Sequence, residues 1–297
     1  MAIFIVGSLN MDLVIKAPFM PENGVTISGE GFMTNPGGKG ANQATAVGKL
    51  GGDAYMVGCV GEAFGDQLIN TLKGYNVRTD YVKKIDTVSS GIAIIVVVDG
   101  DNRIILDSGA NGLVNTDLID CALENAKAGD YLVCQLEIEL AMVEYALKKG
   151  KEKGMITVLN PAPAKFLTDE IIKNSDYFIP NQSETEFYTG IYPKDEVAVR
   201  QCAKILEEKG IRHLLITMGT EGSAYVCGNE FIKVDSFKVK AIDTTAAGDT
   251  FVGAFVTSLS DGCDVKRAMT FASKASSITV TRRGAQQSIP LREEVII

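Results

Sequence analysis

The 297-residue sequence contains no tryptophan, one histidine and six cysteines. The cysteines form no Cys-x-x-Cys pair and have no histidine nearby, so the sequence predicts neither a zinc site nor a disulfide framework. We expect reduced, buried thiols in a cytoplasmic protein at Cys59, Cys121, Cys134, Cys202, Cys227 and Cys263. One imidazole is too few for a histidine-rich metal site, and His213 opens an apolar run. A structural role is expected for His213.

Long hydrophobic runs and excess positive charge are also missing. The longest apolar run, Gly91–Val98, is too short to span a membrane. The first residues, Met1–Gly7, have no basic leader or cleavage site and are typical of a first strand rather than a signal peptide. With 29 basic against 37 acidic residues and a net charge of -8, neither nucleic acid nor a membrane is expected as a partner. An anionic ligand would need a local site.

Apolar strand-like runs alternate with segments of helical period, which predicts an α/β fold with a doubly wound, mostly parallel sheet covered by helices on both faces. The predicted strands are 3–7, 54–60, 131–136, 156–160, 177–180 and 214–218. The predicted helices are 41–50, 66–74, 116–127, 141–153, 197–209, 250–260 and 265–277. Several of these helices are followed by glycine, as helix C-termini prefer.

Two stretches, about 12–36 and 81–110, carry strand-like runs without a helix between them. In the second, the strand 91–98, the turn 99–102 and the strand 103–106 predict a hairpin. Because strand 91–98 is apolar on both faces, we expect an inserted β-sheet lid that covers a ligand on one face and meets another surface, such as that of a second subunit, on the other. The alternative is that this strand lies inside the main sheet. The expected organisation is therefore one domain, 1–297, with an inserted lid.

The segment Asn35–Ala44 contains three glycines that would let the backbone approach a ligand, and the helix after it would supply free amide groups. Lys39 and Asn42 are expected to face the same pocket. The spacing is not that of a Walker loop, and the glycines could instead make a tight entry to the helix.

Asn10 and Asp12 follow the first strand, at the carboxyl ends of the strands, where α/β proteins bind their ligands. A dinucleotide site would need more glycines there, so nicotinamide binding is not expected.

The strongest signal is Ile242–Phe251, which precedes an apolar helix. Its small residues would expose the amides of Ala246, Ala247, Gly248 and Asp249, and these amides would form an anion pocket for a transferring phosphoryl group. Asp249 would accept a proton from a substrate hydroxyl. The alternative is an ordinary aspartate at a helix N-terminus.

Two further segments follow predicted strands. Glu184, in Asn181–Glu184, could organise Mg²⁺ and its waters, although a capping box from Ser183 to Glu186 is a competing interpretation. The glycine-containing segment Thr217–Gly222 could pass close to a nucleotide or could simply be a turn between strands.

Taken together, these motifs resemble the ribokinase-like carbohydrate kinase family, and the resemblance covers essentially the whole chain. The segments that carry it are 7–12, 37–44, 135–137, 159–164, 181–184, 246–249, 281–286 and 290–294. The resemblance implies an enzyme that transfers the γ-phosphoryl group of ATP to the 5-hydroxyl of D-ribose. It also implies Asp249 as general base and a sugar pocket made by Asn10, Asp12, Gly38, Lys39, Asn42, Glu137 and Asp249.

The resemblance further implies an ATP site and two cation sites. ATP would lie against Asn181, Thr217, Gly219, Gly222 and Gly248, with Ser273 near the adenine. Glu184 belongs to the magnesium motif. A K⁺ activator would be held, partly by backbone carbonyls, at Asp243, Thr245, Thr279, Arg282, Gly284 and Ser288. A homodimer through the lid is expected.

The sequence departs from the wider family where Ala246 replaces a glycine, which implies that position 246 need not adopt a positive φ. Three rival functions remain open. The first is a kinase of another sugar or nucleoside, such as 2-deoxyribose, fructose or adenosine. The second is a non-catalytic sugar-binding regulator, and the most distant is a nicotinamide oxidoreductase.

Overall fold

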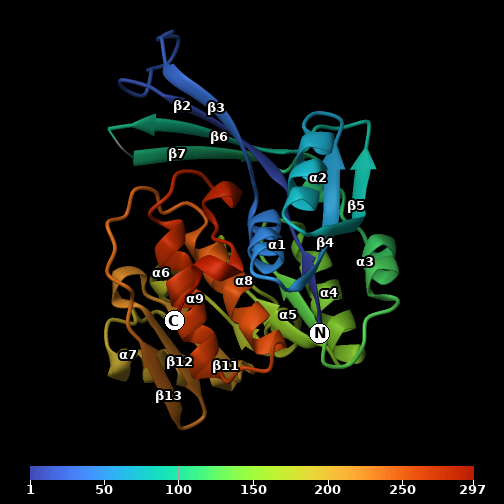
Figure 1. Ribbon diagram of the computed structural model, residues 1–297, viewed down its shortest axis with the longest axis vertical. Helices are drawn as coiled ribbons and strands as arrows, with labels where there is room; N and C mark the ends of the chain where they lie inside the picture. Colours follow the sequence, from blue (N-terminus) through green and yellow to red (C-terminus); the bar gives the residue numbers. More distant parts are fainter. Residues whose placement is uncertain (100) are drawn as a thin grey trace.

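A large, mostly parallel sheet forms the centre of the computed structural model, which describes residues 1–99 and 101–297 (Figure 1). Among the described residues this sheet has nine strands in the order β13-β12-β11-β10-β9-β8-β1-β4-β5. All neighbouring pairs from β5 to β11 are parallel, and β12 and β13 add an antiparallel edge. The strands are β1 Ala2–Val6, β4 Asp53–Gly61, β5 Arg78–Ile85, β8 Tyr131–Cys134, β9 Ile156–Leu159, β10 Tyr177–Phe178, β11 His213–Thr217, β12 Ser223–Cys227 and β13 Glu230–Val234.

Helices cover both faces of this sheet because its strands are apolar on both sides. Ile3 and Ile5 of β1 pack in one core with α1, α2, α8 and α9, whereas Phe4 and Val6 face the core shared with α3, α4, α5 and α7. The α-helices are α1 Lys39–Lys49, α2 Gly65–Gly74, α3 Thr116–Leu123, α4 Leu140–Glu152, α5 Asp169–Lys173, α6 Gln182–Thr189, α7 Glu196–Lys209, α8 Ala247–Ser260 and α9 Val265–Thr279. Short 3-10 turns are η1 Gly109–Leu113, η2 Gly219–Glu221, η3 Gln286–Ser288 and η4 Arg292–Glu294. The predicted fold class is therefore confirmed.

The sequence pattern missed five elements of this domain: β5, β12, β13, α5 and α6. β5 has the sequence Arg-Thr-Asp-Tyr-Val-Lys-Lys-Ile and forms an edge strand beside β4. Its polar residues interrupt the apolar run that would have predicted a strand. The two helices are only five and eight residues long, too short for a clear helical period.

A second sheet, which has four strands within residues 1–99 and 101–297, lies across the top of the view in Figure 1 with the strand order β3-β2-β6-β7. Its strands are β2 Asn10–Lys16, β3 Glu30–Gly37, β6 Gly91–Val98 and β7 Asp101–Asp107. The predicted hairpin of β6 and β7 is present, so β6 does not lie inside the main sheet. Of the predicted turn 99–102, Gly100 lies outside the described residues, and Asp101 and Asn102 already belong to β7.

The predicted lower bound of the second lid segment, residue 81, is wrong. Residues 81–85 belong to β5 and pair with β4 in the large sheet, because their parallel register with 57–61 continues the doubly wound pattern. In the small sheet the strands start at Asn10 and Gly91, which lie opposite each other in β2 and β6.

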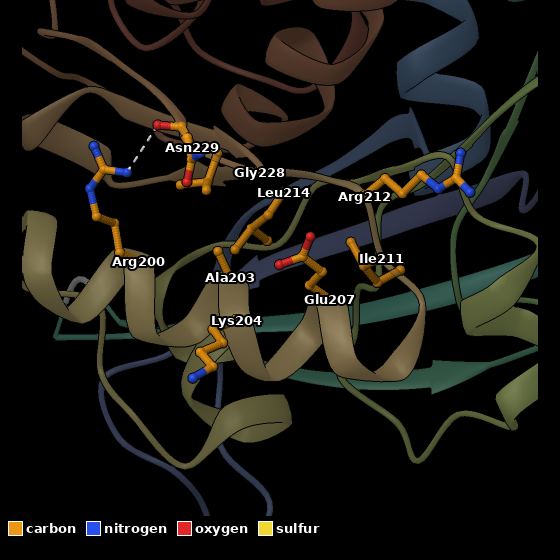
Figure 2. Close-up of a pocket in the computed structure, with 10 residues that line it drawn as sticks. Arg200, Ala203, Lys204, Glu207, Ile211, Arg212, Leu214, Gly228 and Asn229 are labelled. Atoms are coloured by element: carbon orange, nitrogen blue, oxygen red, sulfur yellow. Dashed lines mark hydrogen bonds between the residues drawn. The ribbon is translucent and has the colours of Figure 1, made fainter.

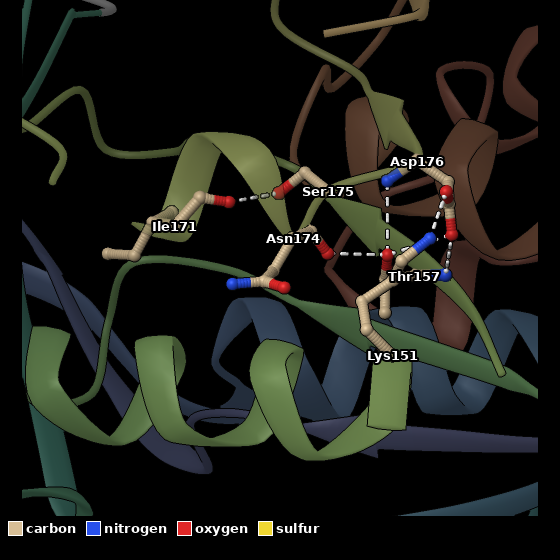
Figure 3. A network of polar contacts seen from close by, with 6 residues as sticks. All are labelled: Lys151, Thr157, Ile171, Asn174, Ser175 and Asp176. Carbon is tan, nitrogen blue, oxygen red and sulfur yellow. Dashed lines mark hydrogen bonds and ion pairs between the residues drawn. The ribbon is translucent and has the colours of Figure 1, made fainter. Parts of the chain in front are cut away.

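A polar network fixes the amino-terminal ends of β9 and β10 (Figure 3). The carboxylate of Asp176 accepts a hydrogen bond from the backbone N–H of Thr157 at 3.0 Å and pairs with Lys151. The Thr157 hydroxyl donates to the carbonyl of Asn174 at 2.6 Å and accepts from the backbone N–H of Asp176 at 3.0 Å. The polar groups of this network form hydrogen bonds and an ion pair with one another. We therefore assign the network a structural role.

His213, at the start of β11, stacks on Tyr177 with ring centroids 4.5 Å apart, and its Nδ1 lies 2.7 Å from the Tyr225 hydroxyl. Burial lowers its pKa below the ordinary value. All six cysteines are free. The prediction that they are buried is right for Cys59, Cys134 and Cys202, but it is wrong for Cys121, which is exposed, and for Cys227 and Cys263, which are partly exposed. Among the described residues, no helix has the length and apolar character needed to cross a membrane.

Candidate active site

Polar side chains gather where the parallel strands of the large sheet end. Ser8 follows β1, Glu137 follows β8, Asn160 follows β9, and Asn181 and Thr217 lie side by side at the ends of β10 and β11. Carboxyl ends of parallel strands share one edge of the sheet, which is where α/β proteins bind their ligands. The first turns of α1 and α8 meet this edge.

The first turn of α1 is tied to the end of β1 by the protein itself. Glu137 Oε2 accepts from the Ser8 hydroxyl at 2.6 Å and from the backbone N–H of Lys39 at 3.1 Å. The N–H of Gly40 donates to Ser8 Oγ at 3.3 Å, and that of Ala41 donates to the Ser8 carbonyl at 2.9 Å. The expectation that this helix start offers free amides is therefore wrong, because Ser8 and Glu137 cap them.

The glycines of the segment 37–40 allow the start of α1 to pack closely against the chain between β1 and β2 and against β2 itself. A Cβ at Gly38 would lie 2.8 Å from the backbone nitrogen of Asn10, and one at Gly40 would lie 2.6 Å from that of Ser8. A Cβ at Gly37 would lie 2.5 Å from the Asp12 carboxylate. The close approach that these glycines permit is thus to the chain's own β1–β2 connection, which brings Asn10 and Asp12 beside α1.

Asn111 of η1, a residue that the sequence analysis missed, fixes the orientation of Asn10. Its Oδ1 accepts from the N–H of Leu9 at 2.9 Å, so its Nδ2 faces the Leu9 carbonyl and donates to Asn10 Oδ1 at 2.7 Å. Asn10 is left with its own NH₂ group for a ligand. No local motif marks Asn111, which is 101 residues from Asn10.

Asp249, in the first turn of α8, is buried with 7% of its surface exposed. Its Oδ2 accepts from Asn42 Nδ2 at 2.9 Å, and its Oδ1 accepts from Gln43 Nε2 at 3.1 Å. The structure thus brings together the predicted pair Asn42 and Asp249. The second donor, Gln43, was missed, although it stands in the glycine-rich segment beside Asn42.

Ala246 precedes α8 with φ 60, in the left-handed region, so the expectation that this position need not adopt a positive φ is wrong. The bend turns the chain into the helix, and an alanine can adopt it at a cost of about 1–2 kcal/mol. The N–H of Ala247 donates to the Thr244 carbonyl at 3.2 Å, whereas within the described chain the amides of Ala246, Gly248 and Asp249 have no backbone acceptor. Three of the four predicted amides therefore remain for an anion.

Charges of both signs converge beside these amides. Burial opposes the charged form of Lys39, yet the carboxylates of Asp249, Glu137 and Glu184 together raise its pKa above the ordinary value. Burial, together with the negative charges of Glu137 and Asp249, raises the pKa of Asp12 to about 7. Lys39 is therefore a cation at neutral pH, whereas Asp12 is close to its midpoint.

Asn181 and Glu184 begin α6 as a reciprocal capping box. Asn181 Oδ1 accepts from the N–H of Glu184, and Glu184 Oε2 accepts from the N–H of Asn181, both at 2.8 Å. The predicted alternative of a capping box was thus right in kind but wrong in its residues, Ser183 and Glu186. Burial raises the pKa of Glu184. Its Oε1 atom remains available for a ligand.

Thr217–Gly222 connects β11 to the antiparallel β12, as the alternative interpretation of this segment predicted. The N–H of Met218 donates to the Gly222 carbonyl at 2.8 Å, and Gly219 and Gly222 both have positive φ. A Cβ at Gly219 would meet nothing within 4 Å, so the turn has open space beside it. Ser273 is buried on α9.

The six residues expected at a K⁺ site lie in the segment before α8, at the end of α9 and in the segment after α9 that includes η3, but their side chains do not converge. Asp243 accepts from the N–H and hydroxyl of Thr245 and from the N–H of Gly284, at 2.6 to 2.9 Å, which joins the segments before α8 and after α9. These hydrogen bonds outweigh burial and lower the pKa of Asp243. The other three side chains bond elsewhere: Thr279 to Thr250, Arg282 to Glu294 and Ser288 to the Ala285 carbonyl.

A separate cavity of about 310 Å³ lies between α7 and the turn after β12 (Figure 2). Arg200, Lys204, Glu207 and Arg212 line it, and it contains none of the predicted site residues. Residues 211–214 lie at the amino-terminal end of β11, opposite the end that carries Thr217. The cavity is therefore distinct from the candidate active site.

The chain matches the family described as pfkB family carbohydrate kinase over residues 2–292. It is 43% identical over 305 aligned residues to a ribokinase of Schizosaccharomyces pombe, covering 99% of this chain and 96% of that protein. It is 36% identical to a deoxyribokinase of Salmonella typhi, covering 99% and 97%. A solved structure of Arabidopsis thaliana ribokinase complexed with ribose and ATP superposes with a TM-score of 0.92 at 29% identity, covering 99% and 97% of the two chains.

The match to the family extends over nearly the whole chain, and it includes both helix starts that meet at Asp249. This protein therefore belongs to the pfkB family of carbohydrate kinases.

Proposed function

We propose that this protein is an ATP-dependent kinase that converts D-ribose to D-ribose 5-phosphate and releases ADP. The observation that carries the proposal is the buried carboxylate of Asp249, held by Asn42 beside Lys39 and the free amides of α8. An anion-binding helix start next to a proton acceptor is what phosphoryl transfer to a hydroxyl requires. The ribokinases among the relatives, at 36–43% identity, support ribose as the acceptor.

The sugar pocket would be made by Asn10, Asp12, Gly38, Lys39, Asn42, Glu137 and Asp249. Asn10 offers an NH₂ donor because Asn111 occupies its oxygen, and Asp12 and Glu137 offer acceptors. A pentose carries several hydroxyl groups, and each must find a donor or an acceptor in a buried pocket. This mixture of donors and acceptors suits such a ligand.

In the proposed reaction, Asp249 draws the proton from the 5-hydroxyl as that oxygen attacks the γ-phosphorus of ATP. The new bond joins the sugar oxygen to phosphorus, the bond from phosphorus to the β,γ-bridging oxygen breaks, and ADP leaves with that electron pair. The amides of Ala246, Gly248 and Asp249 donate to the oxygens of the transferring group, and Lys39 offsets its charge. Asp249 then releases its proton to solvent.

ATP would lie against Asn181, Thr217, Gly219, Gly222 and Gly248, with Ser273 near the adenine. The open space beside Gly219 and the exposure of Gly248 support this assignment. The amide of Ala247, which donates to Thr244, is left out of the phosphate contacts.

Glu184 fits a role in Mg²⁺ binding because one of its carboxylate oxygens remains available beside the site. Among the described residues, no three His, Cys, Asp or Glu side chains form a metal cluster, and Mg²⁺ characteristically keeps several waters and uses few protein ligands. When bound, Mg²⁺ would neutralise charge on the phosphates.

The loops around Asp243 fit a K⁺ ion through their oxygens. Asp243 supplies a carboxylate, and Gln286, two residues after Gly284, has a buried Oε1 for which the described part of the chain offers no hydrogen-bond partner. The remaining ligands would be backbone carbonyls of Thr245, Thr279, Arg282, Gly284 and Ser288. When bound, K⁺ would stabilise the loop that leads into α8.

We also propose a homodimer formed through the small sheet. Ile94 of β6 and Ile105 of β7 are paired across the strands, and 44% and 67% of their surfaces are exposed. Because side chains alternate along a strand, this pair faces away from Asp12 and the sugar pocket. A second copy of the chain would cover this exposed pair.

The free cysteines support a cytoplasmic location, which fractionation of cells would test.

The experiment that tests the activity is a coupled assay of ADP formation with ribose, 2-deoxyribose, fructose and adenosine, with and without K⁺ and Mg²⁺. We expect the highest kcat/KM with ribose, dependence on Mg²⁺ and activation by K⁺. Higher kcat/KM with 2-deoxyribose would assign the protein to the rival function favoured by its 36% identity to deoxyribokinase. Ribose binding without ADP release would indicate a non-catalytic regulator.

A further inference from the structure

A chain of three buried amide side chains ends on Asp249. Gln135 Nε2 donates to Gln43 Oε1 at 2.7 Å, and Gln43 Nε2 donates both to Asn160 Oδ1 and to Asp249 Oδ1, each at 3.1 Å. Gln43 and Gln135 have no exposed surface, and Asn160 has 9% exposed. Gln135 fits because the neighbouring residue is Gly7, where a Cβ would lie 2.1 Å from Gln135 Oε1.

The direction of this chain is fixed by a backbone group. Asn160 Nδ2 donates to the carbonyl of Ile179 at 2.8 Å, and a carbonyl can only accept. Asn160 must therefore turn its Oδ1 toward Gln43, and Gln43 must present its NH₂ group to Asn160 and Asp249. The oxygen of Gln43 then faces Gln135. Neither amide can be flipped without setting two acceptors against each other.

We infer that Gln43 is a positioning residue for the phosphoryl transfer, acting through Asp249 and held by Asn160 and Gln135. This inference rests on the proposed function. With Asn42 on one oxygen and Gln43 on the other, the carboxylate of Asp249 is fixed in rotation, and each of its oxygens keeps a lone pair that can accept from a substrate hydroxyl. The neighbouring charges, Lys39, Asp12, Glu137 and Glu184, do not supply this restraint, because no hydrogen bond joins any of them to Asp249 among the described residues.

A misplacement of about 1 Å in a catalytic group can cost about 100-fold in rate. Loss of the Gln43 donor should therefore lower kcat while leaving the contacts that bind ribose in place. A purely structural role predicts instead that activity falls only as far as the folded fraction falls.

The test compares kcat and KM for ribose in the full-length protein and in three variants. Gln43→Met keeps the length of the side chain and removes its donor, and we expect kcat to fall by about 10–100-fold with KM within about threefold. Gln43→Glu keeps the shape but sets a second carboxylate against Asp249, and we expect at least a further tenfold loss. Thr45→Val is the matched control, because Thr45 lies on the same helix with a buried hydroxyl that has no partner, and its kcat should match the wild type.

Thermal unfolding of each variant separates positioning from folding. If Gln43→Met does not fold, kcat and KM of Gln135→Met test the inference in its place. That variant removes the donor to Gln43 without changing a residue that contacts Asp249. A kcat at least about threefold lower with unchanged KM supports the inference. An unchanged kcat in a folded Gln43→Met variant overturns the inference. If Gln43→Met does not fold, an unchanged kcat in Gln135→Met overturns the inference. Wild-type protein that forms no ADP with any sugar would instead overturn the proposed function.

Discussion

Asn42 on α1 donates its side-chain amide to the carboxylate of Asp249 on α8 at 2.9 Å, across 207 residues of sequence. The contact joins the two helix starts that the sequence analysis singled out separately. It places the proposed proton acceptor beside the residues of the N-terminal half that we assign to the sugar pocket, so the proposed mechanism depends on it.

Replacing Asp249 with alanine should lower kcat for ADP formation by about two to four powers of ten, the scale of general-base catalysis. Ribose binding should persist, because most of the proposed pocket lies in other elements. Steady-state kinetics together with ribose titration by calorimetry would check both parts. Retained turnover in Asp249→Ala would remove this residue from the mechanism.

Asn111→Asp should raise KM for ribose by about 10–100-fold, because the variant turns an acceptor instead of a donor toward Asn10 and disturbs the orientation of that amide. The control is Asn115→Asp, four residues on, where the side chain caps α3 by accepting from Leu118 and aspartate does this equally well. Kinetics with ribose as the varied substrate would measure the difference. Equal KM values in the two variants would contradict the role assigned to Asn111.

The raised pKa of Asp12, about 7, makes stability depend on pH. In the unfolded chain this carboxyl has a pKa of about 4, so the folded state binds the proton more tightly. The free-energy contribution of Asp12 is therefore most favourable below about pH 4 and is lost as pH rises through about 7. Because asparagine does not ionise, the free energy of unfolding of Asp12→Asn should rise relative to that of wild type as the pH increases from about 4 to about 7. The expected rise is on the order of 2–4 kcal/mol.

Urea unfolding of wild type and Asp12→Asn at several pH values would measure this difference. Asp86→Asn, which changes an exposed carboxylate, is the control and should run parallel to wild type. A constant difference between Asp12→Asn and wild type from about pH 4 to pH 8 would contradict the prediction.

Ala246→Gly should stabilise the protein by about 0.5–1 kcal/mol, because glycine adopts the left-handed backbone of this position without strain. Ala247→Gly, one residue on and inside α8, should destabilise it by a similar amount, since glycine lowers helix propensity. Urea unfolding of the two variants gives the comparison. Shifts of the same sign would show that the bend at residue 246 does not behave as described.

Ile105→Glu should lower the fraction of dimer, because it places a charge on the exposed face of the small sheet that we assign to the interface. Ile104→Glu, the adjacent residue on the opposite face of β7, is the matched control and should remain dimeric. Light scattering after size-exclusion chromatography would give the masses. A monomeric wild type would refute the proposed dimer.

Local patterns determined a large part of this protein. The alternation of apolar runs and helical periods predicted the doubly wound sheet, and the position of Asn10, Lys39, Asn42 and Asp249 next to strand ends or helix starts marked them as site residues. Those signals are short in range, so they can be read from the chain directly.

Only the tertiary structure decided which partners these residues meet. Gln43 and Asn111 act on Asp249 and Asn10 from 206 and 101 residues away, and no spacing rule predicts such contacts. The same holds for the caps that Ser8 and Glu137 place on α1 and for the positive φ of Ala246, which follows from where α8 must begin. Hydrogen bonds in a buried site are set by the packing of whole elements, and that packing exists only once the chain has folded.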